Sequence, residues 1–546
     1  MSILKTVDEI SSRNKVRKGW FGFILIFFLV FIIFPSIYVL LFGISDWQTL
    51  QDNVLSNPDR MAVIYGALFN SFGIALIVTL IDIIVGLPMA WIMVRKEFRG
   101  KKYLDTLIDM PLAFPTAALG FSVAIFWSVP VSAPVPAGAL GWFADPLMLI
   151  ILLHIIFTYP YMVRSLSAIL EQIDQNVEMA GMTLGASRFT AVRTITLPLF
   201  RAGMITGFIL CFARSLSETG GTYIALTAIG KDSLFFTGPT LIAHLKDLEG
   251  AQNVQAELVM VSMLLIVSAI LLLFIAKYAM STLRIPWSKV WPRWERKLSR
   301  GLVPKVKDGF SFFFMFLFVI IPSFFIFSYI LMPAPEVFDW SGFFSAIMYS
   351  FAVAGIVTVA DLLLGVPFAI YIARNSRGRL GRLLDSLVNI PLIIPTTALG
   401  FSLGLFWGGQ NLIQDTTVLV ILAHIAFTYP LVVRNVAGAV EEVDPSYEEA
   451  ARTLGAKPFQ AFRKVLLPII KSSLLAGAIL AFTRSLGETG ATIAVHPGAN
   501  TVPVYIVGLI RSDQFYMAAM SSIALILISF LLMFGLRHVT RSRGDQ

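Results

Sequence analysis

The sequence has few charged residues. Asp, Glu, Lys and Arg make up 14% of its 546 residues, whereas 57% are hydrophobic; soluble proteins usually carry about 25% charged residues. This composition excludes an ordinary soluble protein and predicts one embedded in a membrane. Cysteine is nearly absent as well. The single Cys211 excludes an internal disulfide, and its place in an apolar run predicts ordinary packing.

The sequence also lacks the residues that an ATP-hydrolysing or metal-dependent enzyme requires. No G-x4-G-K-[ST] phosphate-binding loop occurs, and the nearest fragment, TAIGKDS at Thr227, lacks the first glycine. The five histidines are scattered, so no metal-ligand cluster is expected. We predict a chain that is not an enzyme, holds no metal and binds no cofactor of its own.

Long apolar runs are abundant. The run from Trp20 to Ile44 has about 25 residues, which at about 1.5 Å per residue is enough to cross a hydrocarbon core of roughly 30 Å. The predicted fold class is therefore all-α and polytopic, with about twelve transmembrane helices. They are expected near residues 20–44, 62–94, 104–129, 146–164, 200–219, 255–280, 309–332, 343–373, 384–408, 416–434, 472–490 and 516–536.

The net charge of +9 reflects topology, because Lys and Arg gather in alternate loops. The positive-inside rule places these loops and both termini in the cytoplasm. The expected location is the cytoplasmic membrane, with no nucleic-acid partner. The basic clusters are Lys15 to Lys18, Arg95 to Lys102, Arg284 to Lys307, Arg374 to Arg382, Arg463 to Lys471 and Arg537 to Arg543.

The chain contains an internal duplication. Three motifs recur in the same order: PLAFPTAALGFS at Pro111 and PLIIPTTALGFS at Pro391, HIIFTYPYMVR at His154 and HIAFTYPLVVR at His424, and RSLSETGGT at Arg214 and RSLGETGAT at Arg484. Six spans per repeat give both repeats the same orientation. We predict a first transmembrane half at 1–280, a basic cytoplasmic linker at 281–308 and a second half at 309–546.

The linker mixes basic and aromatic residues. That composition is compatible with nucleic-acid binding. The favoured interpretation places Trp287, Trp291 and Trp294 at the level of the lipid headgroups, with Arg and Lys meeting anionic lipid.

Two polar loops, 174–200 and 444–470, interrupt the apolar pattern at equivalent places. In the second loop Asp444 is suited to cap a helix, Gly455 to make a turn and Pro458 to begin another helix. Two such loops related by a pseudo-twofold axis would present equal surfaces to a symmetric partner. The alternative is a helix pair that packs only on its own bundle. The first loop repeats the scheme with Asp174, Gly185 and Ser187.

The second loop resembles the E-A-A-x3-G-x9-I-x-L-P loop of permease subunits of binding-protein-dependent ABC importers. The matching residues are Glu449, Ala450, Ala451, Gly455, Val465, Leu467 and Pro468. The first loop departs from the motif, because Met179-Ala180-Gly181 replaces the triplet and Glu178 stands one place earlier, whereas Gly185, Ile195, Leu197 and Pro198 match. The duplicated layout resembles the fused permeases of ferric-iron and thiamine importers over nearly the whole chain.

This resemblance implies a type I ABC importer permease that works by alternating access. Each polar loop would form a coupling helix seated in a cleft of a homodimeric ATP-binding subunit, which would bind ATP and Mg²⁺, and an extracytoplasmic solute-binding protein would deliver the solute. The implied solute is ferric iron or thiamine, with a sulfate or molybdate oxyanion as the alternative. An ion-gradient-driven secondary transporter is the competing class; a channel is less favoured because no selectivity-filter ring is evident.

Several polar residues and prolines fall within the apolar spans, where a charge at a helix centre costs roughly 2.5–3.5 kcal/mol. We expect the charged residues to face protein or water, and to line the translocation path or its gate unless they only lock helices together. The charged residues are Arg214, Glu218, Arg484, Glu488, Asp82 and Asp361. Further path-lining candidates are His154, His424, Pro115 and Pro395; the histidines are expected to be interhelical hydrogen-bonders and the prolines to break or kink their helices.

Overall fold

The computed structural model describes residues 8–9, 11–128, 138–143, 145–247, 254–282, 291–299, 302–334 and 339–541. This part of the chain contains helices and connecting segments without any strand. Nine of its helices are long and apolar enough to cross a membrane, and three bent pairs raise the number of spans to as many as twelve. The predicted all-α, polytopic fold is confirmed. Trp287 lies outside the described residues.

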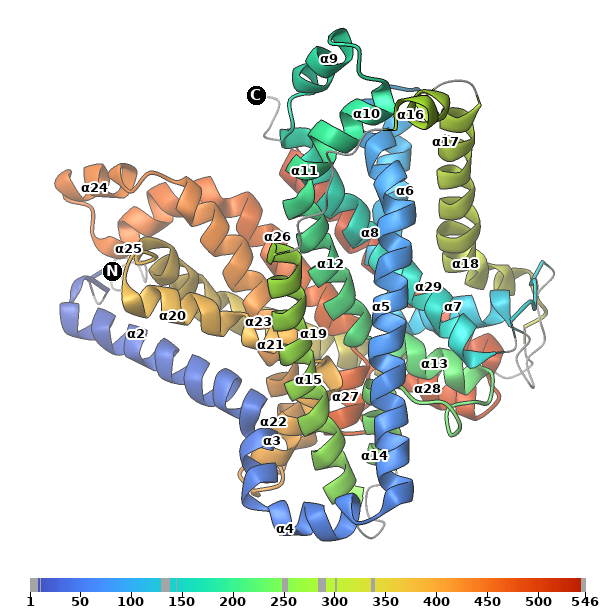
Figure 1. The fold of residues 1–546 in the computed structure, drawn as a ribbon. Helices are drawn as coiled ribbons and strands as arrows, with labels where there is room; N and C mark the ends of the chain where they lie inside the picture. The colour runs from blue at the N-terminus through green and yellow to red at the C-terminus, as the bar shows by residue number, and fades with distance from the viewer. Residues whose placement is uncertain are drawn as a thin grey trace.

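The first span of the first repeat packs against the second repeat (Figure 1). Its helix α3 (Phe34–Ser45) lies along α22 (Thr396–Trp407). Ser402 fixes this contact, because its hydroxyl donates to the carbonyl of Pro35 at 2.6 Å and accepts from the amide of Val39 at 2.9 Å. The serine of the other repeat thus bonds to two backbone groups within one turn of α3.

The first span of the second repeat makes the reciprocal contact. Helix α18 (Ile321–Phe324) lies against α7 (Thr116–Trp127) of the first repeat. The hydroxyl of Ser122 donates to the carbonyl of Pro322 at 2.6 Å and accepts from the amide of Ile326 at 2.9 Å. The two repeats are therefore interlocked by exchanged first spans.

A pair of long helices forms the centre of each repeat. In the first repeat α5 (Pro58–Arg95) packs against α8 (Pro146–Gln172), and in the second α19 (Trp340–Arg374) packs against α23 (Thr416–Glu442). Most of α8 and α23 is buried, since they are surrounded by the other helices of their repeats. A helix that is apolar all round is buried in this way.

The third span of each repeat is broken at the predicted prolines. Helices 101–112 and 116–127 meet at 102° on either side of Pro115, and helices 379–393 and 396–407 meet at 104° around Pro395. The backbone at both prolines is extended, which ends one helix and allows the threonine that follows to begin the next. These are full breaks rather than kinks.

The fifth span of each repeat stops short and is followed by two short helices before the last span. In the first repeat α12 (Arg201–Leu216) is followed by α13 (Gly220–Ala228), α14 (Gly238–Asp247) and α15 (Val254–Thr282). In the second, α26 (Leu467–Leu486) is followed by α27 (Gly490–Val495), α28 (Val502–Arg511) and α29 (Phe515–Arg541). This arrangement places the Arg-x3-Glu spacing, which occurs in both repeats, at a helix end in each.

Candidate functional site

The two polar loops form short helices that project from the bundle at separate places (Figure 1). The first loop contains α9 (Gln175–Thr183) and α10 (Arg188–Ala191), and the second contains α24 (Ser446–Thr453) and α25 (Pro458–Ala461). The predicted turns are confirmed, since Gly185 and Gly455 have φ of +94° and +89°, a region that favours glycine. Asp174 and Asp444 accept hydrogen bonds from the amides two residues on, each at 2.9 Å.

In each loop an apolar side chain at the same position is exposed to solvent. Leu184 and Leu454, which immediately precede the turn glycines, are 90% and 89% exposed. Of the motif residues, Ala180, Glu449 and Ala450 are exposed as well, and Ala451 is half-buried. The equivalent leucine is therefore exposed in both copies of the loop.

The glutamate that precedes the motif anchors each loop to its own bundle. The side chain of Glu178 lies 3.3 Å from the guanidinium of Arg95, and that of Glu448 lies 2.7 Å from Arg374. Both arginines also donate to a loop carbonyl at 2.8 Å, that of Ile173 or Val443. Glu178 is thus the counterpart of Glu448, and its carboxylate is turned toward the protein.

A linker helix braces the first loop alone. Glu295 of α16 (Pro292–Ser299) accepts from the hydroxyl of Thr190 at 2.5 Å and lies 2.8 Å from the guanidinium of Arg193. The hydroxyl of Ser299 accepts from the amide of Phe189 at 2.9 Å. Figure 1 shows α10 and α16 side by side. Sequence inspection does not reveal this brace, because the residues that form it are about a hundred positions apart.

Four of the six predicted intramembrane charges form ion pairs at the ends of α12 and α26. Arg214 lies 2.6 Å from Glu218, and Arg484 pairs with Glu488. The second oxygen of each carboxylate accepts, at 2.9 Å, from the amide that opens the next short helix, that of Gly221 or Ala491. Each glutamate therefore neutralises an arginine and caps a helix, while the arginine is the more exposed partner.

These two helix ends meet at the contact between the repeats. The hydroxyls of Thr219 and Thr397 share a hydrogen bond. A Cβ atom on Gly220 would lie 2.5 Å from the hydroxyl oxygen of Thr489, and one on Gly490 would lie 2.7 Å from the Cβ of Thr219. Both glycines are needed for this close approach.

The proline at the first bend, Pro115, belongs to the same contact. A Cβ atom on Gly487 would lie 3.4 Å from the Cα of Pro115, so the first bend abuts the second repeat. Pro395 occupies the equivalent bend. The structure thus brings Pro115 and the helix-end glycines of both repeats together, although their roles in transport stay predictions.

The two histidines are buried and fully hydrogen-bonded. The ring nitrogens of His154 lie 2.8 Å from the hydroxyls of Ser215 and Thr222. The ring of His424 contacts Ser485 and Thr492 at 2.8 and 2.9 Å. Each ring links its span to the fifth span, α12 or α26, and to the short helix that follows it, α13 or α27, as expected of an interhelical hydrogen-bonder.

The two aspartates lie deep in the bundle, away from the loops. Asp82 accepts from the hydroxyl of Thr158 at 2.5 Å, whereas no hydrogen bond to the carboxyl of Asp361 is present among the described residues. Both side chains are fully buried. Their surroundings do not place them beside Arg214 or Arg484, and their part in a path stays a prediction. Within the described ranges no three His, Cys, Asp or Glu side chains gather as a metal site.

An ion pair that the sequence did not reveal joins the repeats on the side away from α9 and α24. Asp247 and Arg511 are the last residues of the equivalent helices α14 and α28, and they lie 2.6 Å apart. The hydroxyl of Tyr223 also donates to Asp247 at 2.5 Å. This cluster borders a cavity of about 220 Å³ between the repeats.

Comparison with known proteins gives a consistent set of relatives. The family described as "Binding-protein-dependent transport system inner membrane component" matches residues 82–285 and 365–544, once in each repeat. The sulfate transport system permease protein CysT of Salmonella typhimurium is 39% identical over 177 residues, 30% of this chain and 64% of the relative. The alignment therefore spans slightly less than two thirds of that relative's length.

Two molybdenum permeases are similar as well. The molybdenum transport system permease protein ModB of Escherichia coli is 30% identical over 223 residues, 40% of this chain and 93% of the relative. ModB of Mycobacterium tuberculosis is 36% identical over 175 residues, 28% of this chain and 66% of the relative. Each of these relatives covers no more than about one repeat of the present chain.

Proposed function

This chain belongs to the family of binding-protein-dependent transport system inner membrane components, since the family matches both of its repeats, and we propose that the two repeats together form the translocation path of an ABC importer. The main support for the proposal is that Leu184 and Leu454, one in each polar loop, are almost fully exposed. A symmetric cytoplasmic partner with two clefts fits this pair. ATP and Mg²⁺ would bind to that partner, a homodimer of ATP-binding subunits, and both termini would lie on its side of the membrane.

We propose that the solute is an oxyanion of the sulfate or molybdate type. The relatives named above are sulfate and molybdenum permeases, which favours this alternative over the ferric-iron or thiamine solute expected from the duplicated layout. The greater exposure of the arginine in each ion pair at the contact between the repeats is compatible with an anion. The guanidinium-bearing side chains of Arg214 and Arg484 are 20% and 29% exposed, whereas their glutamates are 2% and 3% exposed.

The proposed mechanism is alternating access. ATP-driven closure of the partner would move the two loops, and each loop would transmit the movement through its anchor, Arg95–Glu178 or Arg374–Glu448, to the long helix that carries the arginine. Separation of the repeats on the opposite side would break the Asp247–Arg511 ion pair. The solute would then pass the contact where the helix ends of α12 and α26 meet.

The function is tested by reconstituting the chain with its ATP-binding subunits and its solute-binding protein in vesicles. ATP hydrolysis should rise when the binding protein carries sulfate or molybdate and stay at its basal rate with ferric iron or thiamine. Arg484→Ala should abolish uptake of the oxyanion while the complex stays assembled. Uptake driven by an ion gradient without ATP would instead establish a secondary transporter, and stimulation only by iron or thiamine would overturn the proposed solute.

A further inference from the structure

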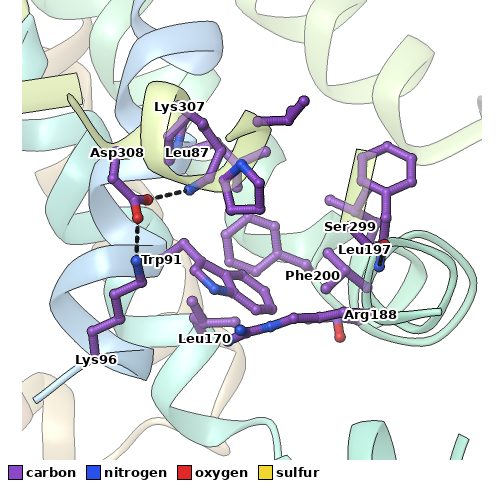
Figure 2. Close-up of a pocket in the computed structure, with 16 residues that line it drawn as sticks. Leu87, Trp91, Lys96, Leu170, Arg188, Leu197, Phe200, Ser299, Lys307 and Asp308 are labelled. Carbon is purple, nitrogen blue, oxygen red and sulfur yellow. Dashed lines mark hydrogen bonds and ion pairs between the residues drawn. The ribbon is translucent and has the colours of Figure 1, made fainter. Parts of the chain in front are cut away.

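A cavity of about 360 Å³ lies beside the first coupling loop (Figure 2). The rings of Trp91 on α5 and of Phe200 line its centre. Lys307 and Asp308 of α17 (Val303–Phe314) lie on one side of these rings, and Arg188 lies on the other. Apolar side chains form most of its wall: Leu87, Pro88, Leu170, Phe189, Val192, Leu197, Val303 and Pro304.

The rim of this cavity has an excess of positive charge. Three basic side chains line it, those of Lys96, Arg188 and Lys307, against the single carboxylate of Asp308. Lys96 and Lys307 both pair with that carboxylate, as the dashed lines in Figure 2 show. The side chain of Arg188 is exposed, and among the described residues it makes no hydrogen bond or ion pair. The rim is thus suited to a ligand that brings its own negative charge.

The position of the cavity favours a membrane amphiphile over a soluble anion. It lies where α5 ends, between the first coupling loop and the linker, on the side of the bundle that carries the coupling loops. Trp294 of the neighbouring α16 and Trp291, which immediately precedes this helix, are 70% and 58% exposed, as expected of a segment at the level of the lipid headgroups. An apolar cavity with a basic rim at this depth matches an acyl chain joined to an acidic headgroup.

The second repeat does not have the same set of residues. Arg188 corresponds to Pro458, Lys96 to Asn375 and Trp91 to Ile370 in the repeat alignment. Among the described residues this basic rim and aromatic floor therefore surround the first coupling loop and not the second, and the first is also the loop that the linker helix braces. A general requirement of the fold would appear in both repeats.

We propose that this cavity binds one acidic phospholipid, with its phosphate between Arg188 and Lys307 and an acyl chain along Trp91. The bound lipid would fill the space between the linker and the first coupling loop, and so would support the loop from its membrane side. This proposal does not depend on which solute is transported.

Native mass spectrometry of the full chain tests the proposal. The detergent-purified protein is mixed with phosphatidylglycerol or phosphatidylcholine of identical acyl chains, and the retained lipid is counted. One phosphatidylglycerol should be retained in preference to phosphatidylcholine. Arg188→Gln should weaken this binding roughly fivefold, the worth of one basic side chain near a lipid surface, and Arg188→Lys should largely preserve it.

The control is Lys464→Gln, which removes an exposed basic side chain from the second coupling loop and should leave phosphatidylglycerol binding unchanged. Equal retention of the two lipids would overturn the proposal, and so would an equal loss in the control variant. Displacement of the lipid by millimolar inorganic phosphate would also overturn it, because the site would then recognise a free anion.

Discussion

The loops at 174–200 and 444–470 occupy equivalent places in the two repeats, yet they are fixed to the protein to different extents. The anchor Arg95–Glu178 is buried, with both side chains 7% exposed, and Glu178 also accepts from the hydroxyl of Thr196 at 2.9 Å. The anchor Arg374–Glu448 is more open, with side chains 21% and 15% exposed. Only the first loop is braced by the linker helix.

The two loops also differ in their motif residues. The second loop has the motif glutamate, Glu449, in an exposed position, whereas the first has Met179 there. The first loop instead gains contacts within its own chain through Glu295 and Thr196. The loop that departs from the motif is thus the one with more contacts to its own chain, and under the proposed function its docking surface would be ordered before a partner binds.

The largest effect is expected from removing the anchors. Arg95→Ala leaves the buried Glu178 unpaired, at a cost of about 3–5 kcal/mol for a fully buried pair. Arg374→Ala should cost less, because its pair is better solvated. Hydrogen exchange should therefore accelerate far more in α9 of the first variant than in α24 of the second. Exposed Arg377 provides the control substitution to alanine. Equal acceleration in both loops would contradict the ranking of the two anchors.

The next largest effect concerns the exposed leucines. Leu184→Asp and Leu454→Asp place a charge where an apolar contact is expected, and each should cost about 2 kcal/mol or more of docking energy, roughly thirtyfold in affinity. Titration of the ATP-binding subunit measures this change, and the melting temperature of the unbound chain should stay constant. If neither variant binds more weakly, the loops are not the docking surface; if only Leu454→Asp does, one loop docks alone.

A smaller effect is expected from Glu295→Gln, which weakens the brace on the first loop only. Hydrogen bonds to charged groups contribute about 1.5–3 kcal/mol, so spin labels on α10 and α16 should show a broader distance distribution. Leu184→Asp should then weaken docking more than it does in the unaltered chain. The second loop is the internal control, since the distance between labels on α24 and α19 should not change.

The same brace predicts a dependence on pH. Burial alone would raise the pKa of the Glu295 carboxyl, but the hydrogen bonds from Thr190 and the Trp291 amide, together with Arg193, hold the pKa below its ordinary value. A lowered pKa means that the stabilisation is complete above the unfolded value of about 4.3 and is lost as pH falls through the folded value. The label distance should therefore be constant near neutral pH and broaden only in acid. A change in the label distance at a pH above 5 would show that a group other than Glu295 causes it.

The smallest effect is expected from exchanging the motif residue. Met179→Glu restores the glutamate that the first loop lacks, and a surface ion pair contributes about 0.2–1 kcal/mol, at most roughly fivefold in affinity. Glu449→Met makes the opposite change. Titration of the ATP-binding subunit should give a gain for the first and a similar loss for the second. A loss for both would show that the two loops contact their clefts differently.

Local chemistry explains why part of this structure is predictable from sequence. Apolar length predicted the spans, and the glycines at 185 and 455 predicted turns that the structure confirms. The prolines at 115 and 395 predicted interrupted helices, since proline cannot continue the hydrogen-bond ladder. In contrast, the Arg95–Glu178 anchor joins residues 83 positions apart, and no local pattern connects them. Because sequence spacing alone was used, Glu178 was assigned to the docking motif. In the structure its carboxylate faces Arg95.

The sequence by itself determined that this chain is a duplicated, helical membrane protein with two polar loops on one side, because apolar length, charge placement and repeated motifs are properties of the chain alone. Only the tertiary structure decided that the first spans are exchanged, that the helix ends of α12 and α26 meet, and that the linker braces one loop. The sequence of an apolar helix does not specify which apolar helix it will contact. Packing and the need to satisfy buried polar groups make that choice.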